Sequence, residues 1–276
     1  MITISAFADE IGPDLKLQMD TCEANGVRCI DVRGIDSTNV SKMTLAQVAG
    51  YKKQLDDRGF RVPCLGSPLG KIRIDEDFAA HLELMKHCCA VAKGFGTDLI
   101  RVFSFYPPTG GDIMKLRDEV MQRLTAMVEL AGREQVVLML ENEKGIYGAK
   151  PEGMKDIFAT IRSPRLKGIF DPANYVEEGI RPYDDGWKKG LDKVTDYFHV
   201  KDKKPGTDTC VPAGEGDGQI AEVARELAQR NWSGVMTLEP HLKVAGQFAG
   251  FTGPQLFGRA VAGLKGILDQ VGLKYS

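Results

Sequence analysis

The chain has 276 residues, with 36 lysines and arginines against 38 aspartates and glutamates and a formal net charge of −2. This length suffices for one large α/β domain or for two small ones. The nearly balanced charge gives no long-range attraction to nucleic acid or to an anionic membrane, and no apolar run reaches transmembrane length. We therefore expect a globular protein without a nucleic-acid or membrane partner.

The N-terminal sequence MITISAFADEIG holds a short apolar run that Asp9 and Glu10 follow at once. It lacks the basic leader of a signal or transit peptide. The six cysteines show no CxxC or zinc-knuckle spacing. Most of them lie in apolar stretches, where cysteine behaves as a small hydrophobe. Both features favour a cytoplasmic location with free thiols.

Short β-like runs alternate with amphipathic helical stretches along the chain. Several runs are continuously apolar, which is typical of parallel strands covered by helices. The predicted strands span 2–7, 28–33, 61–66, 98–103, 136–141, 166–171, 196–201 and 234–239. The predicted helices span 13–25, 45–58, 76–93, 111–133, 151–161, 217–229 and 253–272. Gly26, Gly59 and Gly234 are each expected to close the helix before a strand, and Asp217 to cap the helix at 217–229.

Eight strands at intervals of about 30 to 40 residues, with helices between them, indicate a βα repeat. Right-handed crossovers leave an open doubly wound sheet or a closed eight-stranded barrel. No glycine-rich dinucleotide turn follows the first strand, where AFADEIGPD stands, and this disfavours the open sheet. No linker or change of composition divides the chain. The sequence therefore predicts an α/β fold, a single (β/α)₈ TIM barrel domain over residues 1–276, with a short or broken sixth helix in 174–195.

Four consecutive strands end on residues that can bind a metal. The fifth to eighth strands end at Glu141, Asp171, His199 and Glu239, and active sites of such barrels lie at the carboxyl ends of the strands. Taken singly, each residue is more often a turn former, a core histidine or a solvated rim acid. Three acids in one barrel mouth repel each other unless a cation neutralises them. Mn²⁺ fits this ligand set best, and Mg²⁺, Co²⁺ and Zn²⁺ also suit it.

The motifs LENE, FDPANYVEEG, YFHVKD, PAGEGDGQI and LEPH resemble those of the xylose isomerase-like TIM barrels, the sugar phosphate isomerase/epimerase family. This family includes ketose 3-epimerases, inosose dehydratases and, more distantly, endonuclease IV. GVRCIDVRG, GSPLGKI and RVFSFY are similar to its second, third and fourth strand ends. The resemblance extends over essentially the whole chain.

The resemblance implies that Glu141, Asp171, His199 and Glu239 bind one divalent metal ion. It also implies that Glu141 and Glu239 act as the acid/base pair. The chemistry is consistent with both roles, because removing a proton next to a carbonyl creates an enolate that a Lewis acid stabilises. The substrate would be a small sugar, and family members commonly form homo-oligomers.

One departure from the epimerase pattern matters for the reaction. Those enzymes typically place a histidine three residues after the metal-binding aspartate, where this chain has Asn174. Asparagine can hydrogen-bond a sugar hydroxyl but does not titrate near neutrality. The second and third strands also lack the histidines of the endonuclease relatives, so a trinuclear zinc cluster is not expected. The candidate substrate-binding residues are Asn174, Lys201, Glu215, His241, Glu143 and Arg101.

Several functions are compatible with these residues. The first is a metal-dependent sugar or sugar phosphate isomerase or epimerase working through a metal-stabilised enolate. The second is a metal-dependent dehydratase or lyase acting on a keto-sugar or keto-inositol, since the same enolate can expel a β-hydroxyl. A metal-dependent phosphodiesterase or AP endonuclease is less favoured, and a sugar-binding protein without catalysis is the remaining alternative. The sequence leaves the substrate and the metal undetermined.

Overall fold

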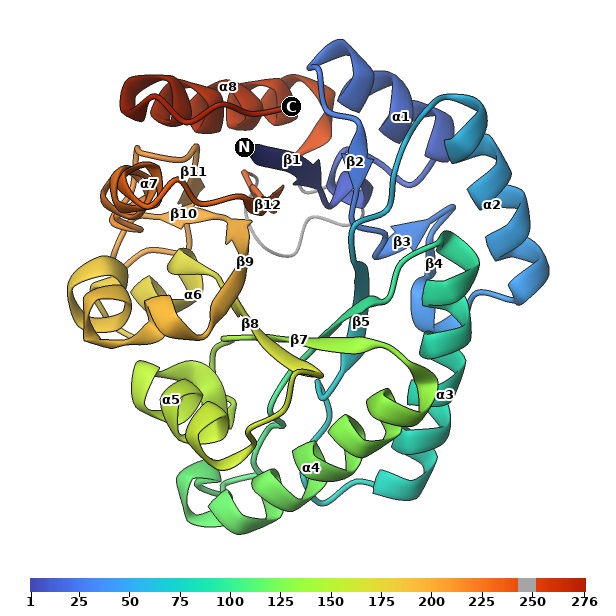
Figure 1. Cartoon of the computed structure of the whole chain (residues 1–276), viewed down its shortest axis with the longest axis vertical. Coiled ribbons are helices and arrows are strands. Elements are labelled where there is room, and N and C mark those ends of the chain that lie inside the picture. Colours follow the sequence, from blue (N-terminus) through green and yellow to red (C-terminus); the bar gives the residue numbers. More distant parts are fainter. Residues whose placement is uncertain (243–251) are drawn as a thin grey trace.

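Eight parallel strands form one sheet at the centre of the molecule, surrounded by helices (Figure 1). The coordinates are a computed structural model that describes residues 1–242 and 252–276. The sheet order is β2-β1-β12-β9-β8-β7-β6-β5. The strands are β1 (Ile2–Ala6), β2 (Cys29–Ile30), β5 (Leu65–Leu69), β6 (Leu99–Val102), β7 (Val137–Glu141), β8 (Leu166–Phe170), β9 (Thr195–Val200) and β12 (Gly234–Leu238).

The two ends of this sheet meet and close the barrel. Isolated parallel bridges join Cys29 to Arg61 and Val32 to Leu65, so the chain around β2 lies beside the chain around β5. The Gly66 N–H donates to the Val32 carbonyl at 2.8 Å across this junction. The fold is therefore the predicted (β/α)₈ TIM barrel, whose strands all direct their carboxyl ends to one face.

Helices follow the strands and cover the outside of the barrel (Figure 1). Several begin at the side-chain caps that favour helix initiation: Asp14 accepts from the Leu17 N–H, and Thr44 and Gln47 form a capping box. The helices are α1 (Leu15–Ala24), α2 (Leu45–Asp57), α3 (Phe78–Phe95), α4 (Arg117–Glu134), α5 (Pro151–Thr160), α6 (Pro172–Glu177), α7 (Ile220–Gln229) and α8 (Gly253–Val271). None of the described helices combines the length and apolarity needed to cross a bilayer.

Shorter elements lie in the connections between strands and helices. After α6 the chain continues through a π-helical turn and two 3₁₀ turns, in agreement with the short sixth helix predicted for 174–195. Two small hairpins add β3 (Gly34–Ile35) with β4 (Thr38–Asn39), and β10 (Asp202–Lys203) with β11 (Cys210–Val211). The 3₁₀ turns span Ala8–Glu10, Val40–Lys42, Ile113–Leu116, Tyr147–Ala149, Trp187–Lys189 and Leu191–Lys193, and the π-helical turn spans Pro182–Gly186.

Two predicted strands differ from the observed ones. The third strand was expected at 61–66, whereas β5 spans Leu65–Leu69. Pro63 lies inside the expected range and has no N–H to give to a parallel ladder, so regular pairing starts after it. The second strand was expected at 28–33, and only Cys29–Ile30 pairs regularly, with Val32 in an isolated bridge.

The seventh helix, expected over 217–229, ends at Gln229 as predicted, but its expected start and the glycine expected to close it were wrong. Asp217 is not its cap, because α7 begins at Ile220 after Gln219, whose backbone is left-handed at φ 50°. Gly234 does not close it either, since Asn231 takes the left-handed conformation and Gly234 is the first residue of β12. A Cβ at position 234 would lie 2.2 Å from the Trp232 ring. Close packing on this ring therefore explains the glycine.

His81 in α3 is a packing residue. It is buried, and its Nε2 accepts a hydrogen bond from the Gly70 N–H at 2.9 Å. Burial, with a smaller contribution from Arg123, lowers the pKa of His81 to about 4. The imidazole is therefore neutral in the folded protein at pH values where an unfolded histidine is already protonated.

This neutral histidine predicts an acid-sensitive stability. Its contribution is fully present above the ordinary histidine pKa of 6.5 and is lost as the pH falls toward 4, because the unfolded state binds the proton first. We expect the free energy of unfolding to fall by up to about 3 kcal/mol over this interval. Urea denaturation at pH 7 and pH 4.5 measures it. The loss should shrink in His81→Gln but persist in His87→Gln, on the same helix, and equal losses in both variants would refute the assignment.

Candidate metal centre

The four strand-end residues predicted to bind a metal come together at the barrel mouth. Glu141 ends β7, Asp171 follows β8, His199 lies in β9 and Glu239 follows β12. One potential ligand atom from each lies within 4.8 Å of the others, and all four residues are buried. Parallel strands that end at one face explain this convergence, because neighbouring strands deliver their last residues to the same layer.

His199 lies between the two glutamates. Its Nδ1 is 2.7 Å from Glu141 Oε1 and 3.5 Å from Glu239 Oε2. The ring packs edge-on against Phe7, with 5.0 Å between centroids and an interplanar angle of 79°. Burial disfavours the charged ring, but Glu141 and then Glu239 outweigh it, so the pKa of His199 is raised. The two glutamates therefore favour the protonated form of the His199 ring that lies between them.

Each glutamate is also paired with an arginine. The Arg101 NH1 lies 3.2 Å from Glu141 Oε2, and the Arg33 NH1 lies 2.8 Å from Glu239 Oε1. Burial would raise the pKa of both carboxyls. For Glu141, His199 and Arg101 reverse this and lower the pKa. For Glu239, nearby cations led by Lys201 lower the pKa well below its usual range, so both glutamates are carboxylates at neutral pH.

Asp171 has a different environment. Its Oδ1 caps α6 by accepting from the Asn174 N–H at 3.0 Å, and its Oδ2 lies 2.9 Å from Lys201 Nζ. Burial raises the pKa of Asp171 to about 7; Lys201 opposes this shift, and Glu141 and Glu239 add to it. A buried carboxyl whose ionisation is opposed by two other acids is a group that a nearby cation would stabilise.

The donor set fits a divalent ion. Glu239 Oε2 is buried without a hydrogen-bond partner among the described residues, and Asp171 Oδ2 has none despite its ion pair with Lys201. The Glu239 oxygen is costly to bury unless a cation or a water satisfies it, whereas the Lys201 ammonium already partly compensates Asp171 Oδ2. Three carboxylates with one imidazole suit Mn²⁺, Mg²⁺, Co²⁺ or Zn²⁺. The residues present could therefore hold one such ion.

A second group of three residues could hold an ion by composition, but its charge is already balanced. Glu10, Glu239 and His241 present one potential ligand atom each within 4.8 Å of the others. Arg33 NH2 lies 3.6 Å from Glu10, and His241 Nε2 lies 2.8 Å from Glu10 Oε1 and 3.2 Å from Glu239 Oε1. Despite burial, Glu10 and Glu239 raise the pKa of His241 to about 9. These cations occupy the place that a second metal would need.

The remaining predicted site residues take varied positions. Arg101, Lys201 and His241 lie against the cluster, each beside one of its carboxylates. Glu143 is on the rim, where Lys71 Nζ lies 2.6 Å from its Oε2. Glu215 is 56% exposed and lies near Arg259 of α8 rather than with the cluster. Its predicted contact with substrate has no support in this arrangement.

Asn174 is buried in the first turn of α6. Its Nδ2 donates to the Asn142 carbonyl at 2.8 Å, and the Asn142 side chain in turn bonds both backbone groups of Asp171. This network fixes the backbone on either side of the predicted ligand Asp171. One N–H of the Asn174 amide is therefore used by the protein, and its second N–H and its carbonyl oxygen could serve the predicted substrate contact.

Sequence reasoning gave no role to Arg33 and Glu10, which lie at or beside the cluster. Arg33 contacts Glu239, and Glu10 contacts His241. Each lies at or just past the end of one of the first two strands, and this position was the available signal. Their partners lie far away along the chain, so the pairing itself could not be read from local sequence.

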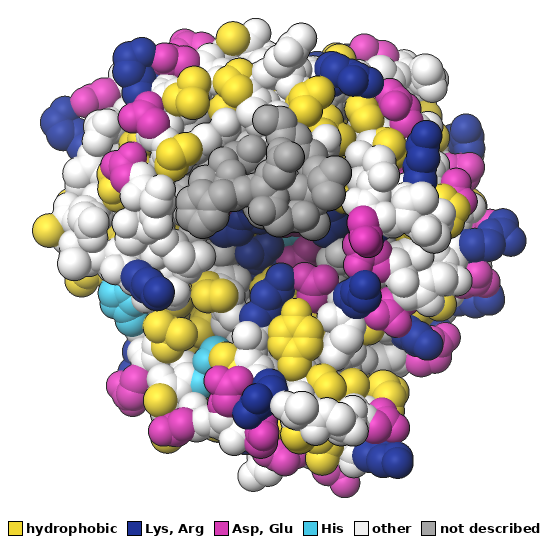
Figure 2. All heavy atoms as spheres, turned by 180° about the vertical axis from the view of Figure 1, so that it is seen from behind, with side chains coloured by type: hydrophobic (Ala, Val, Ile, Leu, Met, Phe, Trp, Pro, Cys, Tyr) yellow, Lys and Arg dark blue, Asp and Glu magenta, His cyan; other side chains and the backbone are white. Residues whose placement is uncertain are grey.

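The face carrying the carboxyl ends of the strands is shown in Figure 2. Basic and acidic side chains gather in a hollow near its centre. Of the cations against the cluster, Arg101 and Lys201 are buried. The mixture of both signs agrees with the compensated charges of the cluster and with a polar ligand rather than an apolar one.

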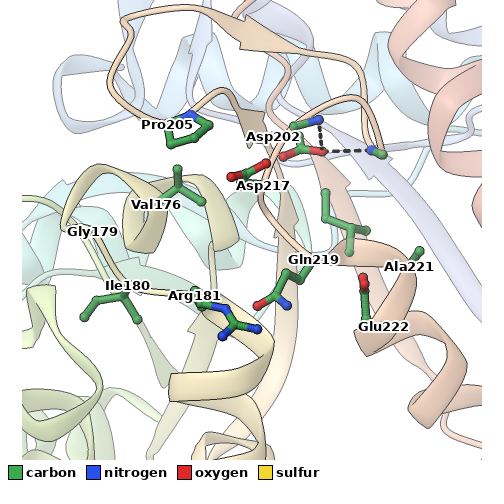
Figure 3. A pocket seen from close by; sticks show the side chains of 13 residues that line it. Val176, Gly179, Ile180, Arg181, Asp202, Pro205, Asp217, Gln219, Ala221 and Glu222 are labelled. Carbon is green, nitrogen blue, oxygen red and sulfur yellow. Dashed lines mark hydrogen bonds between the residues drawn. The ribbon is translucent and has the colours of Figure 1, made fainter.

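Asp202 organises the loop that leads into α7. Its carboxylate accepts backbone N–H groups of Lys203, Gly214, Gly216 and Gly218 at 2.8 to 3.1 Å. Figure 3 shows this carboxylate beside a hollow of about 510 Å³ between α6 and α7. A Cβ at Gly216 would lie 2.4 Å from Asp202 Oδ1, so the glycine permits the close approach. The carboxylate thereby fixes the GEGDG segment next to Lys201.

Asp202→Asn is expected to lower the free energy of unfolding by about 2 to 3 kcal/mol, because it replaces an anionic acceptor with an amide that also presents donors. Urea denaturation at pH 7 measures the change. Asp208→Asn in the same loop is a matched control, since Asp208 is 90% exposed and its change should stay within about 0.5 kcal/mol. A similar effect of both substitutions would contradict the role of Asp202.

Comparison with known proteins identifies the family. The xylose isomerase-like TIM barrel family matches residues 19–251, and the chain belongs to this family. This confirms the resemblance that the strand-end motifs carry. A search of curated protein sequences finds no significant match.

Solved structures with the same fold are distant in sequence. A probable 3-DHS dehydratase of Bacillus anthracis is 18% identical, with a TM-score of 0.76 and 96% of this chain and 99% of that chain covered. The IOLI protein, solved with a zinc atom, is 16% identical, with a TM-score of 0.76 and coverage of 98% and 99%. A D-tagatose 3-epimerase-like protein is 16% identical, with a TM-score of 0.73 and coverage of 98% of both chains.

Proposed function

We propose that the protein is a metal-dependent isomerase or epimerase of a sugar or sugar phosphate, and that it works by proton abstraction next to a carbonyl. The observation that supports this proposal is that Glu141 and Glu239 lie on either side of His199. The His199 Nδ1 is 2.7 Å from a carboxylate oxygen of Glu141 and 3.5 Å from one of Glu239. Proton removal and return require one ionised carboxylate that takes a proton and a second carboxyl that has gained a proton to give back, and the cluster holds two glutamates for these roles.

Glu141, Asp171, His199 and Glu239 would hold one divalent ion, with Mn²⁺ favoured by their oxygen-rich set. When bound, such an ion polarises a carbonyl oxygen and stabilises enolate charge. One glutamate would take the proton from the carbon next to the carbonyl, and the other would return a proton to the opposite side. Both carboxyls have lowered pKa values, so either is in the ionised form that can take a proton at neutral pH, and the other would return a proton only after gaining one from solvent or from the substrate.

Lys201 would bind substrate oxygens beside the ion. It is buried against Asp171, and although burial disfavours its charge, Asp171 and Glu239 keep its pKa well above the ordinary value. Its ammonium group is therefore a fixed positive charge with three donors, which suits hydroxyl or phosphate oxygens. Two of the similar solved structures are named as a dehydratase and as an epimerase-like protein, and both reactions are compatible with this chemistry. Because their sequence identity to this chain is low, the similarity supports the fold and not a particular reaction.

Elimination is the second candidate, and Asn174 favours it. No titrating side chain stands three residues after Asp171, and the amide donor of Asn174 is bonded to Asn142. With fewer groups to return a proton to carbon, loss of a β-hydroxyl from the same enolate is the competing outcome. A keto-sugar or keto-inositol dehydratase would result.

Deuterium exchange tests the proposal without a known product. The Mn²⁺-loaded protein is incubated in D₂O with a panel of keto-sugars, their phosphates and keto-inositols, and ¹H NMR records loss of the proton next to the carbonyl. Exchange that needs the metal supports the proposal. An ultraviolet-absorbing enone would assign elimination instead. No exchange with any member, together with cleavage of a model phosphodiester, would reject both in favour of hydrolysis.

A further inference from the structure

Each of the two glutamates of the cluster forms an ion pair with an arginine from the first half of the barrel. Arg33, just past β2, contacts Glu239, and Arg101 of β6 contacts Glu141. Both arginines are largely withdrawn from solvent, with side-chain exposures of 17% and 6%. The predicted ligands all come from the second half of the barrel, so the two halves meet at these ion pairs.

Each arginine contacts one carboxylate oxygen of its glutamate, and the other oxygen of that carboxylate faces the cluster. Arg101 contacts Glu141 Oε2, whereas Oε1 faces His199. Arg33 contacts Glu239 Oε1, whereas Oε2 lies nearest His199 and is buried without a hydrogen-bond donor among the described residues. The same division of the carboxylate occurs twice, on glutamates from different strands.

A single aromatic ring supports both guanidinium groups. The Arg33 and Arg101 guanidinium carbons each lie 4.8 Å from the centroid of the fully buried Phe7 ring. His199 packs against the same ring. A Cβ at Gly66 would lie 2.6 Å from Phe7 Cε1 and 3.0 Å from Arg33 Cβ. The platform is thus closely packed and leaves little freedom to either arginine.

Further donors of both arginines are hydrogen-bonded to the protein. Arg101 Nε and NH2 donate to the Ser67 and Gly66 carbonyls at 3.3 Å, and Arg33 Nε donates to Asp9 Oδ2 at 2.8 Å. A guanidinium with its donors assigned in this way fixes a carboxylate in one orientation. It is poorly suited to bind a substrate directly, so the structure gives these arginines a positioning role.

Building on the function proposed above, we propose that Arg33 and Arg101 are a matched pair of positioning residues. Each binds the outer oxygen of a glutamate and so presents the inner oxygen alone to the metal ion. Phe7 keeps the two guanidinium groups in place. A lysine at either position keeps the positive charge but lacks the planar set of donors of the guanidinium group. The carboxylate of the glutamate could then rotate.

The test compares Arg33→Lys and Arg101→Lys with Arg117→Lys, a control whose arginine also pairs with a carboxylate, Asp156, but on the outer helices. Binding of Mn²⁺ alone is measured by the electron paramagnetic resonance of the free ion, with no substrate present. We expect each site variant to bind Mn²⁺ roughly tenfold to a hundredfold more weakly than wild type, and the control to stay within about twofold of it.

His81→Gln serves as a second control, which distinguishes a specific effect on metal binding from a general loss of stability. This substitution is expected to destabilise the fold at a position away from the cluster. Circular dichroism melting of the metal-free proteins ranks their stability. Affinity lost in the arginine variants but kept in a His81→Gln protein of equal or lower melting temperature supports the positioning role. If a lysine variant does not fold, Phe7→Leu replaces it, and a loss of affinity of about threefold or more is expected.

Two results would overturn the proposal, and they differ. Wild-type protein that binds no Mn²⁺ would remove the proposed metal-dependent function together with the role of the arginines. Wild-type protein that binds the ion, with folded arginine or Phe7 variants of unchanged affinity, would reject the positioning role alone and leave the proposed function in place.

Discussion

Glu141→Gln and Glu239→Gln are expected to slow substrate proton exchange by about 10²- to 10⁴-fold, the usual contribution of a positioned acid or base. Glutamine keeps the shape of the side chain but cannot accept a proton. Both carboxyls are buried with lowered pKa values, so each wild-type group is ionised at neutral pH and can accept a proton. The measurement is the NMR exchange rate in D₂O, with any keto-sugar that the wild-type protein accepts.

The two variants should differ in a diagnostic way. If one glutamate serves each epimer, each variant loses exchange mainly with one of the two epimeric substrates, and epimerisation fails in both. Glu119→Gln is a suitable control, because Glu119 pairs with Arg123 on α4, away from the cluster. Exchange at the wild-type rate in both site variants would contradict the acid/base assignment.

Loss of the metal is the second large effect that we expect. Combined Asp171→Ala and His199→Ala removes one carboxylate and the only imidazole of the four-residue cluster. Wild-type protein should retain about one divalent ion per chain after gel filtration, and the double variant should retain none. Elemental analysis measures the content. His87→Ala, on α3, should retain the wild-type amount.

The same variants make a prediction about heat and pH. A ligand that binds only the folded state raises its melting temperature, so Mn²⁺ should stabilise the wild-type protein and not the double variant. A proton and the ion compete for His199, and the neighbouring glutamates raise the pKa of this histidine, so the affinity for the ion should fall as the pH is lowered. Affinity that is independent of pH, or an unchanged metal content in the double variant, would contradict the assignment.

The sequence was informative where local pattern decides the structure. Continuous apolar runs followed by Glu141, Asp171 and Glu239 reveal both the strand and the residue at its end. Parallel topology then places these ends together without further information. The barrel and the convergence of the four residues were predictable for this reason. The shift of the third strand also has a local cause, Pro63, which the apolar pattern alone concealed.

The contacts that support the cluster were not predictable in the same way. Arg33 and Glu239 are separated by 206 positions in the chain, and His241 and Glu10 by 231. Arginine after a strand is ordinarily a solvated residue, and only barrel closure places its guanidinium on a particular carboxylate. The sequence drew attention to Asn174, but the hydrogen bond from its amide to Asn142 depends on packing between β7 and α6.

The central claim is that Glu141, Asp171, His199 and Glu239 surround one divalent ion. Crystals grown with Mn²⁺ and measured at the manganese absorption edge test it most directly. The account predicts one strong anomalous peak per chain within ligand distance, about 2.0 to 2.4 Å, of all four side chains. A mouth without such a peak, or a peak held instead by Glu10 and His241, would contradict it.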